Sequence, residues 1–253
     1  MRAEGSEPQT QNPLLTLPHK GRGIIWTTSS GTNLPLNHLT RAGLHEIRAA
    51  AYRDYPAALC FALAAMAEQA VLAARKLVLW CLTKEAAREW GQPYGAGLLA
   101  IGLDPASFLF VEARNAEAAA WALEEGLKSG TLIAALAAVE IKTPLVARRL
   151  GLAAKESRTP CLLLSGQGQA SLPGTVSRWR IAARTSRPAR FDSSAPGSPV
   201  WELTLERCLG EAPGKIFIVE FSHESFRLDL SAAVSDRTAE AGEDRRGFAA
   251  SRR

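Results

Sequence analysis

The stretch that decides the fold is RAGLHEIRAAAYRDYPAALCFALAAMAEQAVLAARKLVLWCL, residues 41–82. Residues 41–47 have the length of a short strand, and Leu77–Leu82 form a continuous apolar run typical of a buried strand. Between them, Ala57–Ala74 are apolar on nearly every side, as expected of a helix that packs against a sheet. The order strand, loop, helix, strand predicts the unit in which P-loop proteins hold a nucleotide.

The loop of this unit, residues 48–56, departs from a phosphate-binding loop. It contains no glycine, so its backbone cannot easily adopt the positive φ angles of a phosphate nest. No Lys-Ser or Lys-Thr pair follows to reach phosphates and a magnesium ion. We therefore expect a degenerate phosphate-loop position, with no cofactor and no catalysis. The residues assigned to this position are Glu46, Arg48, Tyr52, Arg53 and Asp54.

Beyond this unit, apolar strands alternate with helices. The expected strands are 107–112, 132–139 and 161–164, and the expected helices are 116–128, capped by Asn115, and 144–157. This alternation predicts an α/β fold with a mainly parallel sheet flanked by helices on both faces. From Gly174 the apolar period changes to two, which predicts antiparallel strands that extend the sheet. We expect Trp80, Trp121, Trp179 and Trp201 in the core.

The composition of the ends differs from that of the middle. Residues 1–23 and 231–253 are polar, and we expect both to be disordered on either side of one domain at 24–230. The net charge is +5, and 47% apolar and 22% charged residues are ordinary for a globular protein. No signal peptide or membrane span is evident, which predicts a cytoplasmic protein. Four cysteines lie far apart in apolar runs, a pattern typical of buried reduced thiols: Cys60, Cys81, Cys161 and Cys208.

Two short patterns resemble functional motifs but lack the required context. His45-Glu46 has no second histidine four residues on, so we interpret it as a hydrogen-bonded pair that closes a strand, with no metal site. Residues 95–100 fit the dinucleotide pattern G-x-G-x-x-A but follow a loop instead of a strand, which favours a simple helix start. No catalytic constellation is recognisable.

The best candidate interaction surface is a group of arginines near residue 180. Arg178 and Arg180 share one face of an expected strand, while Trp179 lies on the other face. Arginines bind phosphates and carboxylates through bidentate hydrogen bonds, so the group could contact DNA or an acidic protein. A solvated edge strand is an equally good interpretation. The group comprises Arg178, Arg180, Arg184, Arg187 and Arg190.

Six segments, in order, resemble the ImuA family of RecA-like accessory factors for error-prone translesion DNA synthesis. They are GLHEI (43–47), YGAGLLAIGLDP (94–105), WALEEGLKSG (121–130), ARRLGLAAKES (147–157), SRWRI (177–181) and ERCLGEAPGKIFIVEF (206–221). The resemblance covers residues 36–230 and implies a RecA-like core. It also implies a role in the SOS response to DNA damage and in mutagenesis. The implied partners are an inactive Y-family-like polymerase homologue (ImuB-type), an error-prone replicative-type DNA polymerase, and RecA itself.

The implied Walker B strand, Leu132–Val139, carries no acidic residue, and only Glu140 follows it. We therefore expect a non-catalytic subunit that acts by docking to proteins. Two alternatives remain open. One is a divergent RecA-like ATPase that uses Lys76 or Lys84, and the other is a DNA-binding module that acts through the Arg178 and Arg180 strand.

Overall fold

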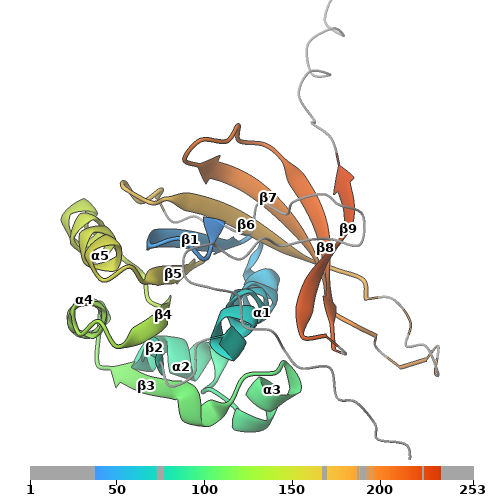
Figure 1. The fold of residues 1–253 in the computed structure, drawn as a ribbon, viewed down its shortest axis with the longest axis horizontal. Coiled ribbons are helices and arrows are strands. Elements are labelled where there is room, and N and C mark those ends of the chain that lie inside the picture. The colour runs from blue at the N-terminus through green and yellow to red at the C-terminus, as the bar shows by residue number, and fades with distance from the viewer. Residues whose placement is uncertain are drawn as a thin grey trace, which may run out of the picture.

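Nine strands form one mixed sheet in the described chain, in the order β3-β2-β4-β5-β1-β6-β7-β8-β9 (Figure 1). The computed structural model describes residues 38–72, 77–166, 170–186, 188, 192, 194–195, 197–223 and 225–234. The strands are β1 (Gly43–Ala49), β2 (Leu77–Thr83), β3 (Phe108–Ala113), β4 (Leu132–Ala138), β5 (Pro160–Ser165), β6 (Ser177–Arg184), β7 (Val200–Cys208), β8 (Ile216–Ser222) and β9 (Arg227–Val234).

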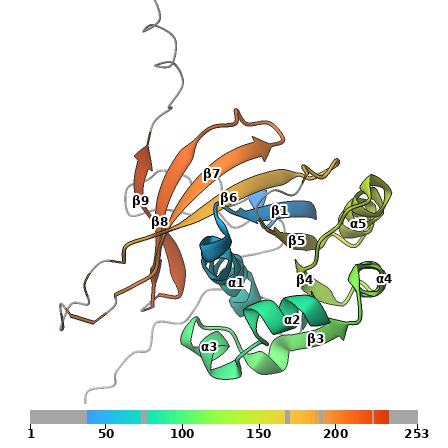
Figure 2. The same ribbon diagram turned by 180° about the vertical axis from the view of Figure 1, so that it is seen from behind.

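Helices cover the two faces of the sheet (Figures 1 and 2). On one face lie α1 (Tyr55–Leu72), α2 (Lys84–Trp90) and α3 (Gly95–Ala100), and on the other lie α4 (Ala116–Lys128) and α5 (Pro144–Glu156). Short 3-10 turns at Tyr52–Asp54 and Pro105–Ser107 precede α1 and β3. Each face has its own apolar core, so the predicted α/β class with helices on both faces is confirmed.

The sheet has a parallel half and an antiparallel half. Strands β1 to β5 pair only in parallel, and β6 to β9 form antiparallel pairs with one another. Strand β6 was expected to run antiparallel, but it lies parallel to β1, with His45 opposite Ser177. Because β5 and β6 both run parallel to β1, β6 begins at the amino end of the parallel strands. A period of two shows which face a side chain occupies and carries no information on strand direction.

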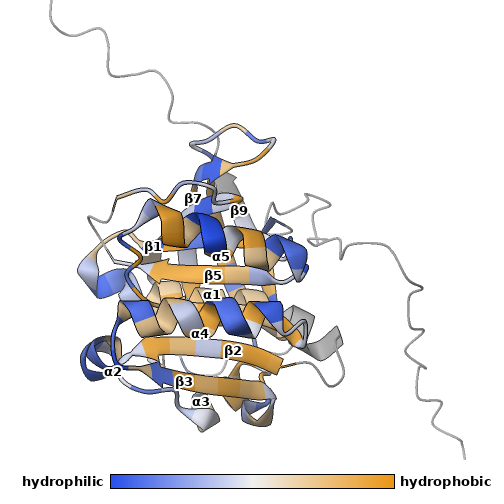
Figure 3. Cartoon of the chain, turned by 90° about the vertical axis from the view of Figure 1, so that its left-hand side faces the viewer, coloured by the Kyte–Doolittle hydropathy of each residue, from blue (hydrophilic) through white to orange (hydrophobic). Residues whose placement is uncertain are grey.

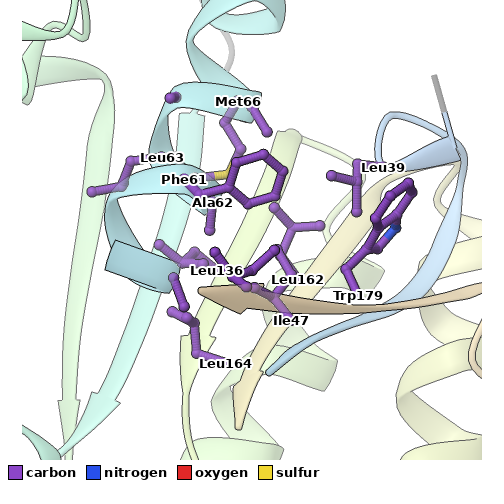
Figure 4. Packing of buried hydrophobic residues seen from close by; sticks show 14 of the residues in the cluster. Leu39, Ile47, Phe61, Ala62, Leu63, Met66, Leu136, Leu162, Leu164 and Trp179 are labelled. Carbon is purple, nitrogen blue, oxygen red and sulfur yellow. The ribbon is translucent and has the colours of Figure 1, made fainter. Parts of the chain in front are cut away.

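Helix α1 packs between both halves of the sheet, because the antiparallel half curls around it (Figure 1). Phe61 is fully buried and meets the ring of Trp201 on β7 edge-on, at 5.8 Å between centroids. Figure 4 shows Phe61, Met66 and Leu162 in this core, with Trp179 nearby. Residues 61–67 of α1 are all buried, which explains why this part of the helix is apolar on every side. Truncating Phe61 to alanine in such a core costs about 3–5 kcal/mol.

The start of α4 agrees with the sequence prediction, whereas the end of the last strand does not. Helix α4 begins after Asn115, whose side-chain oxygen accepts a hydrogen bond from the Ala118 backbone N–H at 2.9 Å. Strand β9 reaches Val234, past residue 230, where the sequence predicted a disordered tail to begin. The predicted segment 1–23 and the rest of the tail lie outside the described residues.

The tryptophan predictions are right for the sheet and wrong for α4. Trp80, Trp179 and Trp201 are buried, whereas the side chain of Trp121 is 65% exposed. Residues 95–100 form the short helix α3 after a loop, as expected. Within the described residues, no helix has the length and apolarity needed to cross a membrane.

Candidate functional site

The candidate site from the sequence lies at the carboxyl edge of the parallel strands, where open α/β sheets bind ligands. Strand β1 ends at Ala49, and a 3-10 turn at Tyr52–Asp54 leads into α1. Strands β4 and β5 end at the same edge, because they are parallel to their neighbours. This is the place where a phosphate loop would hold a nucleotide.

The backbone N–H groups of Ala50, Ala51 and Asp54 in this loop have acceptors within the protein. Ala50 N–H donates to the Ile181 carbonyl at 2.8 Å, which ties the loop to β6. The carboxylate of Asp54 accepts hydrogen bonds from Ala51 N–H at 3.1 Å and Ala183 N–H at 3.3 Å. All residues with positive φ in the described chain lie outside 48–56. The buried carboxylate of Asp54 thus binds donors of the kind that a phosphate nest offers to its ligand.

A cavity of about 350 Å³ opens beside this turn. Tyr52, Tyr55 and Trp90 form its aromatic side, and the rings of Tyr55 and Trp90 stack at 4.3 Å between centroids. Burial, and secondarily the Glu89 carboxylate, raise the pKa of Tyr55 to about 12, so this phenol stays neutral. The lining contributed by the described residues has three carboxylates and no lysine or arginine: Glu85, Glu89 and Glu140. An acidic lining of this kind repels phosphate.

The predicted phosphate-loop group is divided between two places. Tyr52, Arg53 and Asp54 lie in the turn at the carboxyl edge, and Arg53 is exposed there. Glu46 and Arg48 lie inside β1, which ends two residues later than the sequence predicted. They cannot belong to a loop, because their backbones pair with β5 and β6.

Glu46 is fully buried in a polar cluster on the sheet. Its carboxylate accepts a hydrogen bond from Arg178 Nε at 2.6 Å and from the Ser165 hydroxyl at 3.3 Å. Arg178 also donates from Nη2 to the Leu172 carbonyl at 3.1 Å. Arg48 lies 3.8 Å from Glu46 and 3.4 Å from Glu206. The cluster pairs a buried carboxylate with a buried cation across β1 and β6, and so fixes their register.

His45 points to the opposite face of β1 from Glu46, so the two residues do not form the pair that the sequence predicted. Its Nε2–H donates to the Arg41 carbonyl at 2.8 Å, and its Nδ1 accepts from the Ser177 hydroxyl at 2.8 Å. Trp179 Nε1–H donates to the same hydroxyl at 3.0 Å. Burial lowers the pKa of His45 to about 4. His45 is therefore a neutral structural residue.

The three described arginines of the group, Arg178, Arg180 and Arg184, are each paired with a carboxylate. Arg178 is 7% exposed and ion-paired with Glu46, which removes it from any docking surface. Arg180 pairs with Glu206 at 3.2 Å, and Arg184 pairs with Glu202. Alternating carboxylates on β7 thus neutralise the exposed arginines of β6. Arg187 and Arg190 lie outside the described residues.

The cysteines are all free, and their environment makes them poor nucleophiles. Burial raises the pKa of Cys81 to about 11 and that of Cys161 to about 12, so both stay protonated. Among the described residues, no group of three histidine, cysteine or carboxylate side chains is placed to hold a metal ion.

Sequence reasoning missed a groove between α4 and α5. It has a volume of about 560 Å³ and is lined by Trp121 on α4, by Val146 and Arg149 on α5, and by Ile141 after β4, among others. The helical period of 3.6 residues could have shown that Trp121 is exposed on this side of α4. Ala119, Ala120, Leu123 and Leu127 face the sheet, so Trp121 must face away from it.

Comparisons with known proteins give one extensive match. No family model matches the chain. The solved structure of SulA from Pseudomonas aeruginosa superposes with a TM-score of 0.37 and 19% identity, over 49% of this chain and 97% of SulA. Protein ImuA of Caulobacter vibrioides, in two strains, is 30% identical over 256 aligned positions, which cover 95% of this chain and 98% of the relative. The chain therefore belongs to the ImuA family.

Proposed function

We propose that this protein is a non-catalytic accessory subunit of error-prone translesion DNA synthesis in the SOS response to DNA damage. Membership of the ImuA family supports the pathway. The observation that carries the non-catalytic part is the carboxylate of Asp54, which occupies one backbone donor of the degenerate loop, Ala51 N–H, and one of β6, Ala183 N–H. In this proposal the fold is a RecA-like core, and the protein acts in the cytoplasm.

The surroundings of the carboxyl edge support the absence of ATP turnover. Glu140, which follows β4, lies 3.5 Å from Lys142 and is half exposed, so it is poorly placed to orient a magnesium ion. Lys84 begins α2 and is exposed to solvent without lining the cavity, while Lys76 lies outside the described residues. A divergent ATPase would need a cation at this cavity to balance the charge of the triphosphate.

The protein would act by binding other proteins. The proposed partners are the ImuB-type polymerase homologue, an error-prone replicative-type DNA polymerase, and RecA. Direct DNA binding through β6 is the weaker alternative, because Arg178 is buried and both Arg180 and Arg184 are paired with glutamates. A phosphate would have to displace those carboxylates.

Two measurements test the proposal. First, deleting the gene should abolish most ultraviolet-induced mutation, scored as resistant colonies per survivor. The Glu140→Gln and Lys84→Ala variants, which remove the groups that a divergent ATPase could use, should each restore mutation fully. Second, labelled ATP should show no saturable binding to the purified full chain in equilibrium dialysis. Micromolar binding that is lost in either variant would establish an ATPase-type site and overturn the non-catalytic assignment.

A further inference from the structure

The outer faces of α4 and α5 carry large apolar side chains beside cations. Trp121 is 65% exposed, Leu145 63% and Leu152 59%. Leu145 and Leu152 are seven residues apart on α5, so they share its outer side. Figure 3 looks onto these helices and shows hydrophobic and hydrophilic residues mixed along α5 on the side away from the sheet.

Arg148 and Lys155 flank this apolar strip on α5. They are also seven residues apart and exposed. Neither forms an ion pair with another described residue, whereas the cations closer to α4 are paired. Arg149 pairs with Glu124, and Lys128 lies 2.8 Å from the same carboxylate. The hydrogen bond from Lys128, and then that from Arg149, lower the pKa of Glu124.

We use the term α4–α5 surface for five exposed residues of these two helices: Trp121, Leu145, Arg148, Leu152 and Lys155. Its unpaired charges are positive, and the carboxylates in the adjoining groove are largely neutralised. Two carboxylates near this surface form no ion pair with another described residue: Glu117 at the amino end of α4 and Glu156 at the carboxyl end of α5. Tryptophan and arginine are the side chains that most often dominate binding energy at protein interfaces.

We infer that the α4–α5 surface docks an acidic amphipathic helix of a protein partner. Leucine or aromatic side chains of that helix would fill the groove beside Trp121, and carboxylates on its flank would pair with Arg148 and Lys155. The strip of exposed leucines argues against nucleic acid, because a phosphate backbone offers them no apolar contact. The inference rests on the proposed function, which requires a docking surface, and the described arginines of β6 are buried or paired with carboxylates.

The probe is a synthetic helical peptide of about twenty residues, a length that supports appreciable helix. Leucines recur on one side at every third or fourth position, and glutamates fill the flanks. A second peptide has lysine in place of each glutamate. Both are labelled with fluorescein, and binding to the purified full chain is followed by anisotropy.

The glutamate peptide should bind at least about tenfold more tightly than the lysine peptide. The Arg148→Glu/Lys155→Glu variant should lose that binding, and so should Trp121→Ala. The matched control is Lys84→Glu/Arg88→Glu, which makes the same charge change on α2, across the sheet. Equal binding of the two peptides, or binding unaffected by the α5 charge reversal, would overturn the inference. Binding of a DNA oligonucleotide that is lost in the α5 variant, with no peptide binding, would assign the surface to nucleic acid and also overturn it.

The same variants separate this inference from the proposed function in cells. If gene deletion leaves ultraviolet-induced mutation unchanged, the proposed function fails whatever the peptides do. If deletion abolishes mutation and the α5 charge-reversal variant restores it fully, the inference fails while the proposed function stands. We expect deletion to abolish mutation and the α5 variant to fail to restore it, with a melting temperature equal to that of the control variant.

Discussion

Arg178 and Arg180 lie two residues apart on the same face of β6, yet their environments differ completely. Arg178 is buried, and its guanidinium bonds to Glu46 and to the Leu172 carbonyl. Arg180 is about half exposed and bridges to Glu206 on β7. The two arginines differ in solvent exposure. The chain around Leu172 packs over Arg178, whereas Arg180 stays in contact with solvent.

The comparison shows that the contribution of a charged side chain to the free energy of unfolding does not follow from its residue type and strand face alone. A buried ion pair loses hydration that its mutual attraction must balance, and removing one partner leaves an uncompensated charge in the interior. An exposed ion pair gains and loses little, because water screens both groups. One strand therefore contains a structural arginine and surface arginines within eight residues.

The largest effect should follow from breaking the buried pair. Arg178→Met keeps much of the side-chain volume but leaves the Glu46 carboxylate without its cation. We expect a loss of about 3–5 kcal/mol in the free energy of unfolding, measured by urea denaturation. The double variant Glu46→Gln/Arg178→Met should recover part of that loss, because no buried charge remains. A loss below about 1 kcal/mol for Arg178→Met would place Arg178 in the same class as Arg180.

His45 extends the comparison to a buried group that has no counter-ion among the described residues. Its pKa is lowered to about 4 in the folded protein, from 6.5, chiefly by burial. The unfolded chain therefore binds more protons between pH 6.5 and 4, and stability must fall as pH drops through that window. The full loss is about 3 kcal/mol, at about 1.4 kcal/mol for each pH unit.

Urea denaturation at several pH values, with His45→Gln alongside, isolates this contribution from the carboxylates that titrate near pH 4. The stability difference between the wild type and the variant should shrink as pH falls from 6.5 to 4. A difference that stays constant across this window would contradict a neutral buried His45.

Asp54 tests how much a buried carboxylate stabilises the fold when its hydrogen-bond partners are backbone N–H groups. Asp54→Ala removes the acceptor for Ala51 and Ala183, and should lower the free energy of unfolding by about 1–2 kcal/mol. Thermal unfolding and labelled-ATP binding measure the two consequences separately. We expect no gain of ATP affinity, because the acidic cavity remains. Asp54→Asn, which keeps one acceptor oxygen, is the control and should lose less.

The repeating pattern of the chain was enough to predict the layers of the fold. Helix α4 with its Asn115 cap, and the buried Trp179 and Trp201, follow from local periods of 3.6 and 2. The exposure of Trp121 followed from the same period but was missed, because tryptophan was assigned to the core by its type alone.

The burial of Arg178 could not be predicted from local pattern. Its partner Glu46 is 132 residues earlier in the chain, and the two meet because β1 and β6 pair in parallel. That pairing depends on the connection between β5 and β6, for which the sequence has no periodic signal. The role of Asp54 likewise depends on the Ala183 backbone, 129 residues away.

The smallest effect should come from the exposed arginines, which mark the other end of the comparison. Arg184→Ala should change the free energy of unfolding by less than about 1 kcal/mol, and so should Arg180→Ala. A double-mutant cycle between Arg184 and Glu202 isolates their interaction, because each single variant removes it while both positions stay on the surface. The coupling energy should be smaller in 1 M salt than at low salt, because the Debye length in 1 M salt is only about 3 Å. A coupling energy above about 2 kcal/mol that resists salt would mean that this face of the sheet is shielded from water in solution, as it would be if another molecule covered β6 and β7.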